Sequence, residues 1–176
     1  VHQTEQLGTA HAVACAESLL SGKTDAVIVL YGDHPFVQVS TIAKLCELHE
    51  REGRVLSMMT ATVEDFSGWH SPFADFGRVL RDPDGKIIGV MEAKDASPSQ
   101  REIKEVNPSY FCFDSAWLWE NLKKVGNNNV KNEYHLTDLV GIAIDRGEKI
   151  ASMEINPLES LGINTPEHLA LVQQFV

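Results

Sequence analysis

Cysteine is scarce in this sequence, and the few cysteines lie far apart. Cys15, Cys46 and Cys112 each fall in an apolar segment, and no two of them have C-x-x-C spacing. This pattern excludes a zinc site built on C-x-x-C pairs and argues against a disulfide framework. Reduced, buried thiols and a cytoplasmic location are expected instead.

Basic residues are also few: 15 Lys and Arg stand against 25 Asp and Glu, which gives a formal net charge of −10. Nucleic-acid binding depends on a surface rich in lysine and arginine, so no nucleic-acid partner is expected. A small anionic substrate is compatible with this charge if a metal ion, backbone N–H groups or a few local cations offset it. No stretch approaches the roughly 18 uninterrupted apolar residues of a membrane span, so no membrane partner is expected either.

Segments typical of strands and of helices alternate along all 176 residues, and we expect one domain over residues 1–176. The continuous apolar run Asp25–Tyr31 indicates a strand buried on both faces of a sheet. A turn at Asp82-Pro-Asp-Gly85 separates two short apolar segments and predicts an antiparallel β-hairpin over residues 76–91. Further strands are expected at 55–63, 105–113 and 149–155, and helices at 7–20, 40–52, 115–124, 136–146, after Ser97 and after Thr165. The alternation predicts an α/β fold with a mainly parallel sheet.

Asp33 is the first candidate for ligand binding, because it directly follows the most apolar predicted strand. Ligands of open α/β sheets bind at the carboxyl ends of parallel strands, and an Asp there can hold Mg²⁺, which bridges substrate phosphates. A turn-capping role would explain Asp33 as well. Gly8 and Thr9 offer backbone N–H groups at a predicted helix start, with Thr9 as its N-cap, although an ordinary helix N-terminus is the simpler explanation. Capping alone could likewise explain Thr137.

Eight short motifs follow one another between residues 3 and 164. They are Gln3-Thr-Glu-Gln-Leu-Gly-Thr9, Leu30-Tyr-Gly-Asp-His-Pro35, Phe76-Gly-Arg78, Glu92-Ala-Lys-Asp-Ala96, Glu105-Val-Asn107, Asn127-Asn-Asn129, Glu133-Tyr-His-Leu-Thr-Asp138 and Gly162-Ile-Asn164. Each is weak alone, but together and in this order they resemble the uridyltransferase domain of bacterial N-acetylglucosamine-1-phosphate uridyltransferases, of the nucleotidyltransferase family. The resemblance implies a Rossmann-like nucleotidyltransferase fold. It also implies that UTP and N-acetylglucosamine 1-phosphate react, with Mg²⁺, to give UDP-N-acetylglucosamine, a cell-wall precursor, and pyrophosphate.

The same resemblance implies roles for single residues. The nucleotide would be bound by Gln3, Gly8, Thr9, Gly32 and Asp33. The sugar phosphate would be bound by Gly77, Glu92, Asn107 and Thr137. Asp33 and Asn164 would hold the metal and so take part in catalysis. The oligomeric state is left open, a homo-oligomer included.

The sequence also departs from the family in several places. The family opens with a Gly-rich loop followed by Arg and Lys that grips the triphosphate, and nothing in this sequence matches it. We therefore expect the chain to be incomplete at its N-terminus and inactive by itself. On the sugar side, Pro108-Ser109 stands where Thr-Gly is usual, the segment 69–75 is longer than usual, and His135 replaces a tyrosine. The alternatives are another hexose 1-phosphate, dTTP in place of UTP, or a non-catalytic nucleotide-sugar-binding domain.

Overall fold

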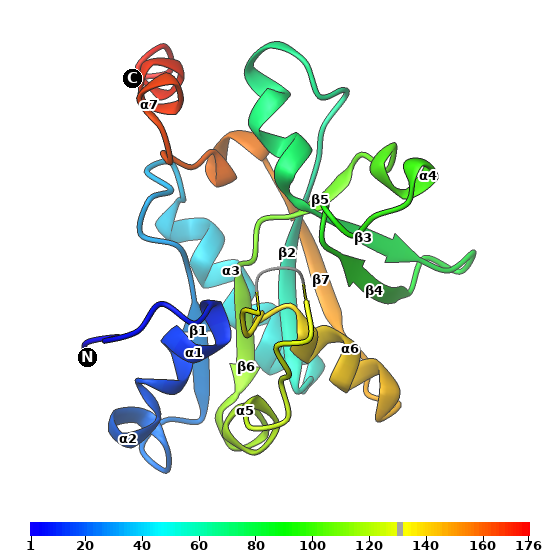
Figure 1. The fold of residues 1–176 in the computed structure, drawn as a ribbon. Helices are drawn as coiled ribbons and strands as arrows, with labels where there is room; N and C mark the ends of the chain where they lie inside the picture. The colour runs from blue at the N-terminus through cyan, green and yellow to red at the C-terminus, as the bar shows by residue number, and fades with distance from the viewer. Residues whose placement is uncertain (130–131) are drawn as a thin grey trace.

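A computed structural model of the chain describes residues 1–129 and 132–176. Within these residues seven strands form one sheet (Figure 1). The strands are β1 (Ala26–Val29), β2 (Leu56–Thr62), β3 (Gly77–Arg81), β4 (Ile87–Met91), β5 (Glu105–Asn107), β6 (Phe111–Asp114) and β7 (Ala151–Ile155). They follow the order β1-β6-β2-β5-β3-β4, and β7 pairs with β2 outside this path.

The prediction of a mainly parallel sheet is wrong. In the described residues β1–β6, β2–β6, β2–β5, β3–β5 and β3–β4 all pair antiparallel, and only β2–β7 pair in parallel. The cause is a reversed segment, β5 and β6, that lies against β2. Because β6 separates β1 from β2, these two strands run in the same direction without pairing. The α/β class and the β3–β4 hairpin are confirmed, whereas the directions of pairing are corrected.

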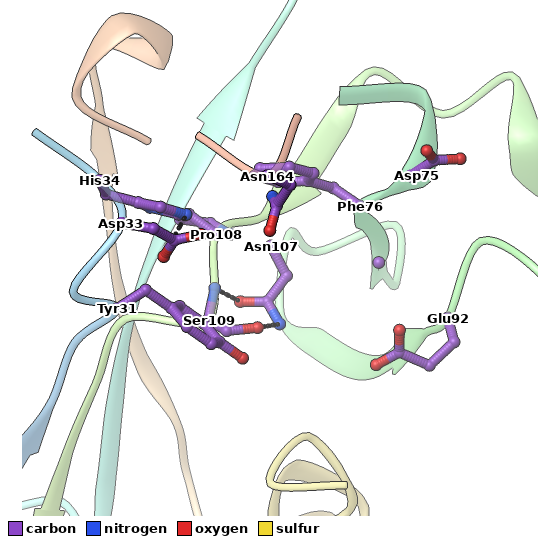
Figure 2. Close-up of a pocket in the computed structure, with 11 residues that line it drawn as sticks. Tyr31, Asp33, His34, Asp75, Phe76, Glu92, Asn107, Pro108, Ser109 and Asn164 are labelled. Carbon is purple, nitrogen blue, oxygen red and sulfur yellow. Dashed lines mark hydrogen bonds and ion pairs between the residues drawn. The ribbon is translucent and has the colours of Figure 1, made fainter. Parts of the chain in front are cut away.

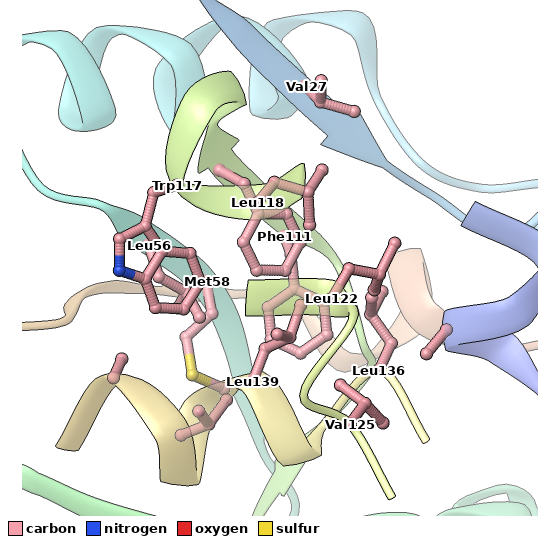
Figure 3. Packing of buried hydrophobic residues seen from close by; sticks show 14 of the residues in the cluster. Val27, Leu56, Met58, Phe111, Trp117, Leu118, Leu122, Val125, Leu136 and Leu139 are labelled. Atoms are coloured by element: carbon pink, nitrogen blue, oxygen red, sulfur yellow. The ribbon is translucent and has the colours of Figure 1, made fainter. Parts of the chain in front are cut away.

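Helices cover both faces of the sheet. They are α1 (Thr9–Ala14), α2 (Glu17–Leu20), α3 (Val39–Glu52), α4 (Pro98–Arg101), α5 (Ser115–Leu122), α6 (Asp138–Asp145) and α7 (Pro166–Val172), with 3-10 helices η1 (Gly68–Asp75) and η2 (Pro157–Ser160). Alternate residues of β2 supply two cores, since Met58 packs in one core with α5 and α6 and Met59 in another with α3. Figure 3 shows the first core, in which Trp117 and Leu139 lie near Met58.

Three local expectations are corrected by the structure. The predicted helix 7–20 is divided into α1 and α2, and its N-cap is Gly8 rather than Thr9, whose hydroxyl instead accepts from the backbone N–H of Leu136. The strand expected to be buried on both faces is β1, which lies at the end of the sheet and leaves Ile28 37% exposed. Of the three cysteines only Cys112 is buried. No helix of the described residues is long and apolar enough to cross a membrane.

The predicted strand 105–113 is interrupted, and the interruption shapes the site. Ala61 of β2 pairs with Val106 and Met58 pairs with Phe111, so three steps along β2 face five steps along its neighbour. The two extra residues are Pro108 and Ser109. Pro108 has no N–H to donate to a strand neighbour, and Ser109 takes a left-handed backbone with φ of 60°. This bulge divides β5 from β6.

Candidate active site

A pocket of about 210 Å³ lies among the loops that follow β1 and η2 and the ends of β3, β4 and β5 (Figure 2). Its lining residues are Tyr31, Asp33, His34, Asp75, Phe76, Gly77, Glu92, Asn107, Pro108, Ser109 and Asn164. Five of the residues expected to bind metal or sugar are therefore brought together, from segments far apart in the sequence. Figure 2 places Asp33 on one side of the pocket and Glu92 on the other, with Asn107 and Asn164 between them.

The two residues expected to hold a metal sit on loops that are joined to each other. Asp33 follows β1, and Asn164 lies between η2 and α7. The backbone N–H of Ile163 donates to the carbonyl of Asp33 at 3.0 Å, which ties the second loop to the first. Side chains with hard oxygen atoms, a carboxylate and an amide, thus reach the same pocket.

His34 contacts residues of both loops and Tyr110, which directly precedes strand β6. Its Nδ1 lies 2.5 Å from the hydroxyl of Tyr110, which donates its own proton to the carbonyl of Glu159 at 3.0 Å. The hydroxyl can therefore only accept from His34, so Nδ1 carries the hydrogen and Nε2 lies 3.9 Å from Oδ1 of Asp33. Burial lowers the pKa of His34, against the nearby charge of Asp33, and favours the neutral ring.

Gly162 leaves room for that ring. A Cβ atom at this position would lie 2.7 Å from Nε2 of His34, closer than real Cβ contacts come. The glycine of the Gly162-Ile-Asn164 motif is thus required for packing between the two loops.

The polar sugar-side residues are held by hydrogen bonds to other side chains and to the backbone. The Thr137 hydroxyl donates to Oε1 of Glu92 at 2.8 Å. Thr137 does not line the pocket itself, but it holds the carboxylate of Glu92, which does. Asn107 accepts from the backbone N–H of Ser109 at 2.9 Å and donates to its hydroxyl at 3.2 Å. These two bonds fix the Asn107 amide and leave one of its two N–H groups for a ligand. Gly77 forms a wall without a side chain, where a Cβ would come within 3.0 Å of Val90.

Three of the five residues expected to contact the nucleotide, Gln3, Gly8 and Thr9, line a second hollow, of about 360 Å³. Its lining residues are Gln3, Gln6, Gly8, Thr9, Ala12, Glu133 and His135. Gly8 has a φ of 115°, and a Cβ there would lie 2.5 Å from the carbonyl oxygen of Tyr134, so only glycine fits. The Gln3 amide contacts Nδ1 of His11 at 2.9 Å. Gly32, also expected near the nucleotide, is exposed and lines neither hollow.

The two hollows are linked by a third, of about 660 Å³. It shares Asp75 and Glu92 with the first pocket and His135 with the second. Tyr31 lines the first pocket, where burial and the charges of Glu92 and Asp33 raise the pKa of its phenol. Most of the expected nucleotide and sugar residues thus line hollows that share lining residues, whereas Gly32 and Thr137 line none of the three.

Sequence reasoning assigned no binding role to six further lining residues, Tyr31, His34, Asp75, Phe76, Pro108 and Ser109, although it placed Pro108-Ser109 and the segment 69–75 on the sugar side. All of them lie within the recognised motifs or within two residues of one. Adjacency to a motif is therefore the signal that could have identified them.

The structure is thus an α/β domain with one hollow near α1 and another between Asp33 and Glu92. The family model described as nucleotidyl transferase matches residues 1–157. The chain belongs to the nucleotidyl transferase family.

Several relatives carry the name bifunctional protein GlmU. The protein from Brevibacillus brevis is 38% identical over 175 residues, which is 99% of this chain and 36% of the relative. That from Geobacter sulfurreducens is 40% identical over 169 residues, 96% of this chain and 34% of the relative. That from Pelotomaculum thermopropionicum is 40% identical over 175 residues, 99% of this chain and 37% of the relative. The chain thus spans a little over a third of the length of these relatives.

Proposed function

We propose that this chain carries the nucleotide and sugar sites of a uridyltransferase that joins UTP to N-acetylglucosamine 1-phosphate. The observation that carries the proposal is the meeting of Asp33, Gly77, Glu92, Asn107 and Asn164 around one pocket. The motif resemblance predicted these residues for metal and sugar binding. Membership of the nucleotidyl transferase family and the similarity to proteins named GlmU support the same reaction.

In this reaction an oxygen of the sugar phosphate attacks the α-phosphorus of UTP. The bond between the α- and β-phosphates breaks, and pyrophosphate leaves with its electron pair. Such a transfer needs positioning and neutralisation of charge more than it needs a protein nucleophile. Glu92, oriented by the Thr137 hydroxyl, accepts hydrogen bonds from sugar hydroxyls, and the free N–H of Asn107 donates one.

Asp33 and Asn164 are the residues that would hold Mg²⁺. Both present oxygen atoms to the pocket, and among the described residues no group of three or more His, Cys, Asp or Glu forms a metal cage. Two protein ligands completed by water and substrate phosphates are the coordination that Mg²⁺ favours. When bound there, the ion offsets phosphate charge in a pocket whose own carboxylates, on Asp33, Asp75 and Glu92, would otherwise repel the substrate.

Turnover by the full-length protein tests the proposal. Pyrophosphate release is measured with UTP or dTTP, Mg²⁺ and either N-acetylglucosamine 1-phosphate or glucose 1-phosphate. We expect the UTP and N-acetylglucosamine 1-phosphate pair to be preferred. Preference for another pair would change the substrate, and nucleotide-sugar binding without turnover would favour the non-catalytic alternative.

Asp33→Asn should abolish this turnover while the protein remains folded, because the amide loses the charge that holds the metal. Asp82→Asn is the matched control, since Asp82 is a partly exposed acid of the β3–β4 turn whose side chain accepts from backbone N–H groups of its own hairpin. Near-normal turnover in Asp33→Asn would remove Asp33 from the mechanism.

A further inference from the structure

Arg78 is buried in an unusual way for an arginine. Its side chain lies within the protein, with the residue only 2% exposed, and no carboxylate of the described residues forms an ion pair with it. Its guanidinium donates to four backbone carbonyls instead. Nη2 donates to Ala74 at 3.0 Å, Nε to Arg101 at 3.3 Å, and Nη1 to Phe73 and Phe76.

Three of these carbonyls belong to the last turn of η1 and the residue that follows it. This is the segment that delivers Asp75 and Phe76 to the pocket, immediately before Gly77. Arg78 therefore fixes the backbone of one pocket wall directly, although its own side chain does not line that pocket.

The fourth carbonyl connects Arg78 to the turn that follows Glu92. It belongs to Arg101, whose own guanidinium donates to the carbonyls of Ala96 at 3.1 Å and Lys94 at 3.4 Å. Lys94 and Ala96 belong to the turn that begins at Glu92. The backbone N–H of Asp95 donates to the carbonyl of Glu92 and closes this turn. The two arginines thus join the η1 wall to the Glu92 wall.

The fork of the guanidinium is what makes this arrangement work. Arginine presents five N–H donors in a fixed plane, whereas lysine concentrates three on one atom and cannot reach four separated carbonyls. The Phe66 ring lies 4.5 Å from the guanidinium carbon and gives a cation–π contact that partly offsets the loss of water. Burial lowers the pKa of Arg78, as this loss of water requires.

We propose that Arg78 is a positioning residue that sets the distance between the η1 wall and Glu92, and thereby decides how well the sugar of a nucleotide sugar fits. The inference rests on the proposed function for the identity of the sugar. The nucleotide part is proposed to lie against another set of residues, near α1; Arg78 does not line that hollow, although it lines the third one. Arg78 thus affects sugar binding specifically, and not binding in general.

Arg78→Lys tests this, with Arg81→Lys as the matched control. Arg81 lies in the same strand and also uses its fork, but to donate to the carboxylate of Glu105 at 2.7 and 2.8 Å, near the protein surface. Dissociation constants for UDP-N-acetylglucosamine and for UDP are measured by calorimetry. In Arg78→Lys we expect the first to weaken roughly tenfold or more and the second to stay within about twofold. Arg81→Lys should change neither.

Phe66→Leu provides a second variant that leaves all four carbonyl bonds possible and removes only the ring. It should weaken UDP-N-acetylglucosamine binding in the same direction, by less than Arg78→Lys does. If Arg78→Lys does not fold, this variant alone decides, and unchanged sugar-nucleotide binding overturns the inference. Equal weakening of UDP and UDP-N-acetylglucosamine also overturns it. Failure of the unaltered protein to bind any nucleotide sugar would contradict the proposed function instead, together with the inference that rests on it.

Discussion

Ser109 occupies a backbone conformation that suits glycine, and replacing it tests the structure of the sugar side. Its φ of 60° is left-handed, a region that costs a residue with a Cβ about 1–2 kcal/mol. At the same time its hydroxyl accepts from the Asn107 amide at 3.2 Å, a bond with a net worth of about 1 kcal/mol. Replacement by glycine removes both the strain and the bond, so the two effects must be separated.

Comparison of Ser109→Gly with Ser109→Ala separates them. Both variants lose the hydroxyl, but only alanine keeps a Cβ in the left-handed region. Glycine gains the relief of strain and gives back about 0.4–1 kcal/mol through the greater freedom of its unfolded chain. The glycine variant should therefore be more stable than the alanine variant by about 1 kcal/mol.

Thermal unfolding followed by circular dichroism measures this difference. For a chain of 176 residues, about 1 kcal/mol corresponds to a difference in Tm of about 2–4 °C. Ser109→Gly should melt higher than Ser109→Ala by this amount and close to the unaltered protein. If Ser109→Ala melts as high as Ser109→Gly or higher, then Ser109 is not left-handed and the bulge between β5 and β6 is wrongly described.

Two further predictions concern histidines. Gly162→Ala places a Cβ 2.7 Å from Nε2 of His34 and should displace the Asp33 loop. Titrations of the variant with a nucleotide sugar, with and without Mg²⁺, should show that the Mg²⁺-dependent part of binding is lost. An unchanged dependence on Mg²⁺ would contradict this prediction. Burial lowers the pKa of His49, although the charges of Asp114 and Glu50 oppose this shift. The stability that depends on the neutral ring is therefore present above the unfolded pKa of about 6.5. It is lost as the pH falls from about 6.5 through the folded pKa. His49→Gln should make the fall of Tm below pH 6.5 shallower, and an unaltered fall would show that another group titrates.

The local elements could be predicted from the sequence because their signals are local. The Ser97 capping box and the Thr165 N-cap form as their residue types predict. Strand direction could not be predicted, because a buried apolar strand has the same composition whichever way it runs. The reversal of β5 and β6 becomes visible only through their pairing with β2.

The site was predictable to a similar extent. The motif order indicated Asp33, Glu92 and Asn107, and the structure brings them to one pocket. The structural role of Arg78 was not predictable, since arginine in a strand usually marks an exposed face. Its burial depends on carbonyls of η1, a 3-10 helix that the apolar pattern did not indicate.

Calorimetric titration with UDP-N-acetylglucosamine and Mg²⁺, beside UDP-glucose, dTDP-glucose and GDP-mannose, tests the central claim most directly. Under the proposed function the site should bind UDP-N-acetylglucosamine selectively, because separate sets of residues are proposed for its uracil and for its sugar. Glu92→Ala should reduce that selectivity by weakening the sugar contact. Equal affinity for all four compounds, or binding of none of them, would contradict the assignment of these residues to a uridine nucleotide and an N-acetylated sugar.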